Sequence, residues 1–145
     1  MNATIVRFGY PDTRVAEYRH WVVLLRRQQP TLGSLVLAAR GDFTSLSDLP
    51  AEAFTELARA VSDIESTLRT RIAYDKINYL MLMMVDPHVH WHVIPRYEGA
   101  REAIGLAVAD KGWPKLPELG AAVTLDPAQI EGLCGWLRRD WPVAQ

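Results

Sequence analysis

Three histidines at alternate positions constrain this chain more than any other feature. The 145-residue sequence has four histidines, and three of them are His88, His90 and His92. The residues between and after them are valine, tryptophan and isoleucine, which favour a β-strand, so we expect a strand over residues 86–96. Side chains alternate across a strand, so the histidines should share one face and the apolar residues the other. The sequence predicts one chemical face and one packing face.

The composition predicts a single domain spanning residues 1–145. Hydrophobic residues make up 49% of the chain and charged residues 23%, which suits one compact core. The formal net charge of -1 gives no field that would attract nucleic acid or an anionic membrane. Cys134 is the only cysteine, which excludes an internal disulfide and agrees with a reducing compartment. No signal peptide or membrane-spanning run is found, so a cytoplasmic location is expected, with no nucleic-acid or membrane partner.

Short apolar runs predict the other strands of the sheet. They cover residues 4–8, 20–25, 34–39 and 77–85. The second and third runs flank a loop and form an antiparallel pair. The last run contains Met81, Met83 and Met84, which we interpret as adaptable core filler.

A long helix is predicted after the third of these strands. Apolar residues recur at helical spacing from Phe54 to Leu68. Pro50 suits its first turn, and Ser47 and Asp48 offer capping oxygens. This helix is expected to cover the sheet.

A second helix is predicted near the carboxyl end. Asp126 at the N-cap, Pro127 at the first position and Gln129 at the third form a typical helix start. Cys134 lies on its apolar stripe and is interpreted as a core residue. Residues 98–124, rich in Gly, Pro and Ala, are predicted to be an irregular arm with a functional role.

Three imidazoles on one strand face permit three interpretations. In the first, neutral His90 attacks phosphorus and forms a covalent phosphoramidate. His88 and His92 would then donate hydrogen bonds to phosphate oxygens or protonate the leaving group. In the second, adjacent histidines bind a metal ion, although His88 and His92 lie about 13 Å apart along an extended strand. In the third, the sheet surface simply carries histidines. We favour the first, without a metal or other cofactor.

The sequence HVHWHVI, residues 88–94, resembles the defining motif of the histidine triad (HIT) family. The following Pro95-Arg96 resembles its dinucleoside-polyphosphate hydrolase branch, and weaker similarity covers residues 22–97. The resemblance implies an α+β fold with an antiparallel sheet of about five strands against one long helix, usually paired as a homodimer. The predicted C-terminal helix would complete this HIT-like domain.

The resemblance also implies a function. It indicates a nucleotide hydrolase that cleaves a phosphoanhydride or phosphoramidate bond through a nucleotidyl-His90 intermediate, with no obligatory metal. The ligand would be a purine nucleotide or dinucleoside polyphosphate, with Asn78 and Arg96 assigned to bind its nucleotide or phosphate. His92 points toward hydrolysis, because the related transferases carry glutamine at that position.

Two departures from the family pattern affect this function. Family members commonly place Gly, Gln and Ser or Thr before the triad, where this chain has Met83, Met84 and Val85. Arg26 stands where an asparagine is usual. Since an apolar run cannot donate hydrogen bonds to phosphate, the alternative is a nucleotide-binding regulatory protein with little turnover.

Overall fold

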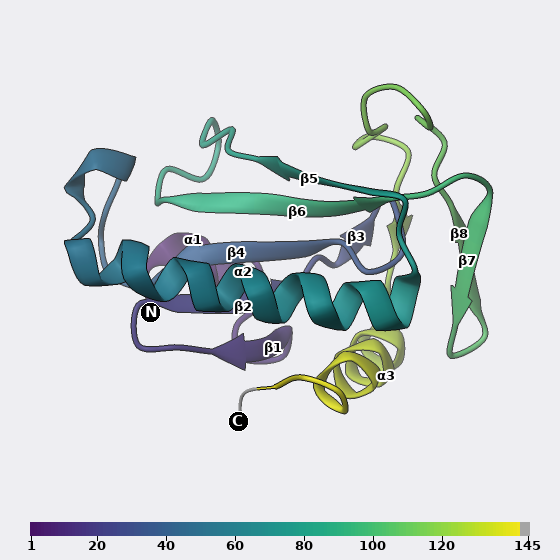
Figure 1. Cartoon of the computed structure of the whole chain (residues 1–145), viewed down its shortest axis with the longest axis horizontal. Coiled ribbons are helices and arrows are strands. Elements are labelled where there is room, and N and C mark those ends of the chain that lie inside the picture. The colour runs from purple at the N-terminus through teal and green to yellow at the C-terminus, as the bar shows by residue number, and fades with distance from the viewer. Residues whose placement is uncertain (143–145) are drawn as a thin grey trace.

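The computed structural model describes residues 1–142, so the last three residues of the predicted domain lie outside the described residues. A five-stranded antiparallel sheet has the strand order β1-β2-β4-β6-β5 (Figure 1). Its strands are β1 (Arg14–Glu17), β2 (Trp21–Leu25), β4 (Leu35–Ala39), β6 (His90–Arg96) and β5 (Lys76–Leu80). The two smaller sheets pair β3 (Gln28–Gln29) with β9 (Val123–Thr124), and β7 (Ala100–Ala103) with β8 (Leu106–Ala109). The helices are α1 (Ala3–Arg7), the short 3-10 helix η1 (Leu46–Asp48), α2 (Ala51–Ile72) and α3 (Pro127–Arg138).

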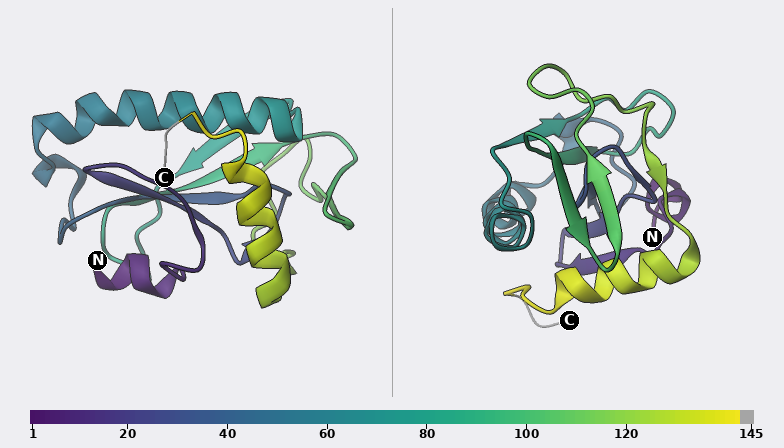
Figure 2. Two further views of the ribbon diagram at one scale, coloured as in Figure 1. Left: turned by 90° about the horizontal axis from the view of Figure 1, so that it is seen from below. Right: turned by 90° about the vertical axis from the view of Figure 1, so that its right-hand side faces the viewer.

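The main sheet lies between two helices, which gives its two faces different roles. α2 covers one face and α1 lies against the other (Figure 2, left). The α2 face holds the main core, in which Val23 and Leu37 are clustered with Ile64 of the helix. On the α1 face, a smaller apolar cluster consists of Ile5, Val22, Leu24, Val36 and Ala38. The predicted α+β fold, with five antiparallel strands, one long helix and a C-terminal helix, is confirmed.

The predicted strand at residues 4–8 is wrong, because this segment forms helix α1. The Asn2 side-chain oxygen accepts a hydrogen bond from the Ile5 N–H at 2.9 Å and so caps the helix. The Asn2 amide group donates to the carbonyl oxygens of Ala39 at 3.1 Å and Gly41 at 2.7 Å. A five-residue apolar pattern fits either period, and the cap and the burial of Ile5 against the sheet decide for the helix.

The antiparallel pair β2–β4 and the long helix α2 are confirmed, but the helix start is not as predicted. Pro50 is the N-cap residue and provides no side-chain cap. Ser47 and Asp48 do not cap α2, because both belong to η1, which precedes it. Phe54 is 42% exposed, so the buried stripe of α2 is narrower than the apolar pattern suggested.

The apolar run at residues 77–85 is a strand only in its first part. β5 ends at Leu80, and the chain then forms a loop before β6. Met84 is 87% exposed, so its assignment as core filler is wrong. Met81 and Met83 do pack against the core. The end of β5 is set by its pairing with β6, because Leu80 opposite His92 is the last pair of the two strands.

The segment at residues 98–124 is more regular than predicted. The β7–β8 hairpin projects beyond the end of the main sheet, and β9 pairs with β3 (Figure 1). The α3 start is confirmed as a capping box, with the Gln129 N–H donating to the Asp126 carboxylate at 2.8 Å. Cys134 is 1% exposed, as expected of a core residue. Within residues 1–142, no helix is both long and apolar enough to cross a membrane.

Candidate active site

Strand β6 places His90 and His92 side by side on the α1 face of the sheet. Both are buried, and their ring centroids are 5.1 Å apart with the planes at 81°. Phe8, just after α1, packs against both rings, with centroid distances of 5.4 Å and 5.8 Å. On the opposite face, Val89 and Val93 belong to the main core. The predicted division of this stretch into a chemical face and a packing face therefore holds for its second half.

His88 lies in the bend before β6, so the predicted strand over residues 86–96 begins only at His90. The His88 Nδ1 lies 2.8 Å from the Thr4 hydroxyl oxygen, which also accepts the His88 backbone N–H at 3.3 Å. Its Nε2 is 3.8 Å from a carboxylate oxygen of Asp42. His88 thus connects the triad to α1.

The contact of His90 with the backbone assigns its tautomer. The His90 Nδ1 lies 2.7 Å from the carbonyl oxygen of His88. A carbonyl oxygen only accepts hydrogen bonds, so Nδ1 must carry the proton of the neutral ring. The lone pair is then on Nε2, which is the state that a nucleophilic imidazole needs.

The contact of His92 with Arg26 assigns the opposite tautomer. The Arg26 Nε donates to the His92 Nδ1 at 3.2 Å, and a guanidinium only donates, so Nε2 of His92 carries the proton. Burial, followed by the charges of Arg26 and His90, lowers the pKa of His92 to about 4. His92 is therefore a neutral hydrogen-bond donor at neutral pH. This contact is not predicted from the sequence, where its only sign is that Arg26 stands in place of a usual asparagine.

His90 and His92 line a cavity of about 230 Å³, which we call the histidine pocket. The residues that line it are Phe8, Arg26, Leu82, Met83, Met84, Val85, Asp86, His90 and His92. The apolar residues 82–85 thus form a wall of the same pocket as the histidines. Their side chains offer no N–H or O–H donors to a phosphate.

Asn78 and Arg96 lie on the sheet face of the histidines but outside the histidine pocket. Arg96 is four residues beyond His92, which corresponds to about 13 Å along the strand. Its Nη1 donates to the Asn78 side-chain oxygen at 2.9 Å, and its remaining bonds go to Asp110. Both residues line a separate cavity of about 380 Å³, together with Lys76 and residues 113–116. Their role in binding phosphate stays a prediction.

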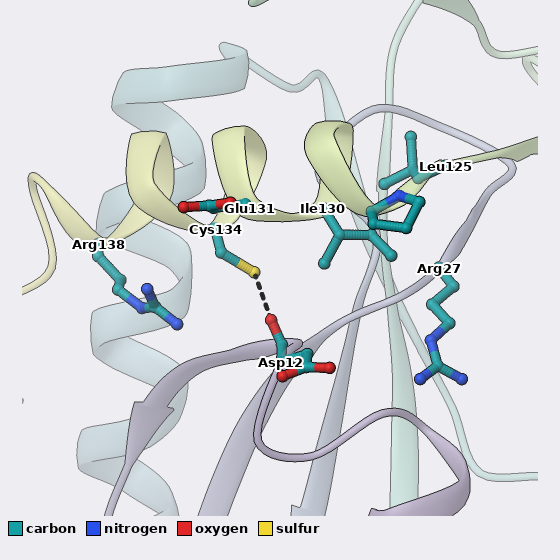
Figure 3. Close-up of a pocket in the computed structure, with 8 residues that line it drawn as sticks. Asp12, Arg27, Leu125, Ile130, Glu131, Cys134 and Arg138 are labelled. Carbon is teal, nitrogen blue, oxygen red and sulfur yellow. Dashed lines mark hydrogen bonds between the residues drawn. The ribbon is translucent and has the colours of Figure 1, made fainter.

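Figure 3 shows another cavity, of about 550 Å³, which we call the large cavity; it shares no lining residue with the histidine pocket. It is enclosed by α3, the turn near Asp12 and the side chain of Arg27. Cys134 points across it toward the Asp12 carbonyl oxygen at 3.9 Å, and burial raises the pKa of its thiol to about 11. The thiol is therefore protonated and a poor nucleophile. The histidine pocket is therefore the better candidate for the active site, although the large cavity has the greater volume.

The metal interpretation requires several ligand side chains to lie close together. Within residues 1–142, no three His, Cys, Asp or Glu side chains gather as a group that could hold a metal ion. His88 contacts Thr4 and does not line the histidine pocket with the other two.

Comparison with known protein families matches residues 9–99 to the HIT domain. The chain therefore belongs to the HIT domain family, which includes nucleotide hydrolases and nucleotide-binding proteins. The predicted family is confirmed, while the dinucleoside-polyphosphate hydrolase branch stays a prediction. Among curated proteins, no sequence matches this chain significantly.

Solved structures share the fold at low sequence identity. A histidine triad protein from Bradyrhizobium japonicum is 20% identical with a TM-score of 0.73, and the match covers 97% of this chain and 96% of that one. One from Sinorhizobium meliloti is 19% identical with a TM-score of 0.71, covering 97% and 95%. A Zn-bound histidine triad family protein from Mycobacterium smegmatis is 19% identical with a TM-score of 0.58, covering 93% and 90%.

Proposed function

We propose that this protein is a nucleotide hydrolase in which His90 is the nucleophile. The Nε2 lone pair of His90 attacks the phosphorus of a nucleoside monophosphate unit, and the bond from phosphorus to the leaving oxygen or nitrogen breaks. The leaving group takes a proton from solvent, and a nucleotidyl-His90 phosphoramidate forms. Water then attacks the phosphorus, the P–N bond breaks, and the imidazole and a nucleoside monophosphate are released.

The observation that carries this proposal is the 2.7 Å contact between the His90 Nδ1 and the His88 carbonyl oxygen. It keeps the proton on one nitrogen and the lone pair on the other. His92, in the complementary tautomer, is suited to donate its Nε2 proton to a phosphate oxygen. Phe8 packs on both rings, which restricts their rotation.

A second candidate function is a nucleotide-binding protein with little turnover. The apolar wall at residues 82–85 favours it, because it supplies no side-chain donors to the charge that develops on phosphate oxygens. This alternative would be identified by a protein that binds nucleotide tightly but does not release product in an amount many times that of the protein.

We also propose that the protein forms a homodimer. β5 is an edge strand of the main sheet, so one side of its backbone is available for pairing. An apolar cavity of about 240 Å³ on the α2 side includes Leu57 and Val61 of the helix and Tyr79 of β5. Closed two-fold pairing is the commonest soluble assembly. The cytoplasmic location expected from the sequence stays a prediction.

The covalent intermediate provides the test of the proposed function. Purified protein is incubated with a diadenosine polyphosphate, an adenosine phosphoramidate or a dinucleotide sugar, then quenched and weighed by mass spectrometry. The expected result is an increase by one nucleotide, labile in acid, in wild type and not in His90→Ala. His92→Ala should still form the adduct, more slowly, because loss of one donor typically costs on the order of 10²–10³ in rate.

Chelator separates this mechanism from the metal interpretation. We expect adduct formation and turnover to continue when a chelator is present in excess. Activity that disappears with chelator and returns with Zn²⁺ would favour histidines as ligands. An adduct on His90→Ala would show that another residue is the nucleophile.

A further inference from the structure

Three arginines surround a second cavity beside the histidine pocket. This cavity has a volume of about 180 Å³ and is called the arginine pocket here. Arg7, Phe8, Arg26, Arg27 and Gln28 line it. Phe8 and Arg26 line the histidine pocket as well. A ligand seated at the histidines can therefore extend past Arg26 toward the other two arginines.

Two of these arginines have no carboxylate partner among the described residues. Among residues 1–142, no carboxylate forms an ion pair with Arg26 or Arg27, whereas Arg7 pairs with Asp86 at 3.2 Å. Arg26 is half-buried, and burial lowers the pKa of its guanidinium, which nevertheless stays protonated. A partly buried cation without a counter-charge costs free energy. A bound anion would remove that cost.

Neutral groups hold the two unpaired guanidinium groups in place. The Arg26 Nη1 donates to the Gln28 carbonyl oxygen at 3.0 Å, and the Arg27 Nη1 donates to the Arg7 carbonyl oxygen at 3.4 Å. At Gly9, whose φ is +96°, an added Cβ would lie 2.7 Å from the Arg27 Nη2, so the glycine makes room for this side chain. Each guanidinium has five N–H donors, and its planar fork fits phosphate oxygens.

Arg27 separates the arginine pocket from the large cavity beneath α3. It lines both cavities. Its guanidinium lies away from the helix, at the far side of the large cavity (Figure 3). The large cavity also exposes the carboxylates of Asp12 and Glu131, whereas no carboxylate lines the arginine pocket. An anion therefore fits the arginine pocket better than the larger one.

We propose that Arg7, Arg26 and Arg27 form a subsite for a phosphate group of the substrate beyond the one that His90 attacks. This inference rests on the proposed function and narrows its substrate class. The substrate is a nucleotide joined through a phosphoanhydride to at least one further phosphate. A phosphoramidate with a neutral leaving group would not use the subsite. The arginines supply the donors that the apolar wall at residues 82–85 lacks.

Nucleotide binding tests the subsite without requiring turnover. Calorimetric titrations with adenosine mono-, di- and triphosphate should give a wild-type affinity that rises about tenfold or more along the series, because guanidinium–phosphate hydrogen bonds belong to the strong class. Arg27→Gln should lose most of this rise and bind the monophosphate as wild type does. Arg59→Gln is the matched control, because it removes the same charge from an exposed position on α2, across the sheet. It should behave as wild type.

Kinetics with two substrates then connects the subsite to catalysis. We expect Arg27→Gln to lower kcat/KM about tenfold or more for a diadenosine polyphosphate and by less than about twofold for adenosine phosphoramidate. Equal losses on both substrates would assign the arginines to the attacked phosphate and overturn the subsite. Equal wild-type affinities for the three nucleotides would also overturn it, even if hydrolysis proceeds. A rise in affinity without turnover would support the subsite and refute only the proposed function.

Discussion

Arg96 and Asp110 form a two-point ion pair, with Nε 2.8 Å from Oδ2 and Nη2 3.1 Å from Oδ1. Their side chains are only 5% and 1% exposed. Asp110 also accepts the backbone N–H groups of Tyr97 and Gly112, at 3.2 Å and 3.3 Å. The pair therefore ties the end of β6 to the segment after β8. It gives Arg96 a structural task that competes with its predicted role in binding phosphate.

Asp110→Asn should destabilise the protein by about 3–5 kcal/mol, because it leaves a buried guanidinium without its counter-charge. Denaturant unfolding followed by circular dichroism measures this change. Asp126→Asn serves as the control, since Asp126 is exposed and asparagine also caps helices well. A small effect of Asp110→Asn would mean that Arg96 is available to a ligand.

His92 should make stability depend on pH in acid. Its pKa is about 4 in the folded protein and near 6.5 when unfolded. Between pH 6.5 and pH 4, His92 binds a proton in the unfolded chain but stays neutral in the folded protein. Its contribution to the free energy of unfolding is therefore present above pH 6.5 and is lost as the pH falls from 6.5 to 4. The loss is on the order of 3 kcal/mol.

Unfolding of wild type and His92→Gln at pH 7.5 and pH 4.5 isolates this contribution. Other groups that titrate cancel in the difference between the two proteins. The wild type should lose more stability than the variant on acidification. Identical losses would show that His92 is not held neutral by its surroundings.

Met84→Gln should leave stability unchanged within about 0.5 kcal/mol, because the side chain is exposed. Leu68→Ala, within the core beneath α2, should cost about 2–5 kcal/mol under the same conditions. Thermal or denaturant unfolding compares the two variants. A loss of more than about 1 kcal/mol in the free energy of unfolding of Met84→Gln would show that Met84 is a core residue, as predicted from the sequence.

Sedimentation at micromolar concentration should show a species with twice the monomer mass. Val61→Glu places a charge in the apolar cavity beside β5 and should shift the equilibrium to monomer. Ser62→Glu, at the neighbouring exposed position of α2, should remain dimeric. A monomer mass for wild type at every concentration would refute the homodimer.

The alternation of the histidines by itself placed His90 and His92 on one face of a strand, whereas the family and the α+β fold were implied by the resemblance of the motif to the HIT family. The shared face could be predicted because the strand period is local and apolar residues fill every second position. The capping residues of α3 could also be predicted from the sequence, since a capping box involves only four consecutive residues. The resemblance to relatives also marked Arg26 and residues 83–85 as departures.

Tertiary structure decided everything that depends on partners distant in sequence. Whether residues 4–8 form a strand or a helix depended on Asn2 reaching the carbonyl oxygens of Ala39, at the end of β4, and of Gly41. The exposure of Met84 depended on where pairing between β5 and β6 ends. Neither the proton positions on His90 and His92 nor the shared role of Arg26 in two pockets can be seen in a local pattern. The proton positions are assigned by hydrogen-bond partners, and only the folded chain brings those partners together.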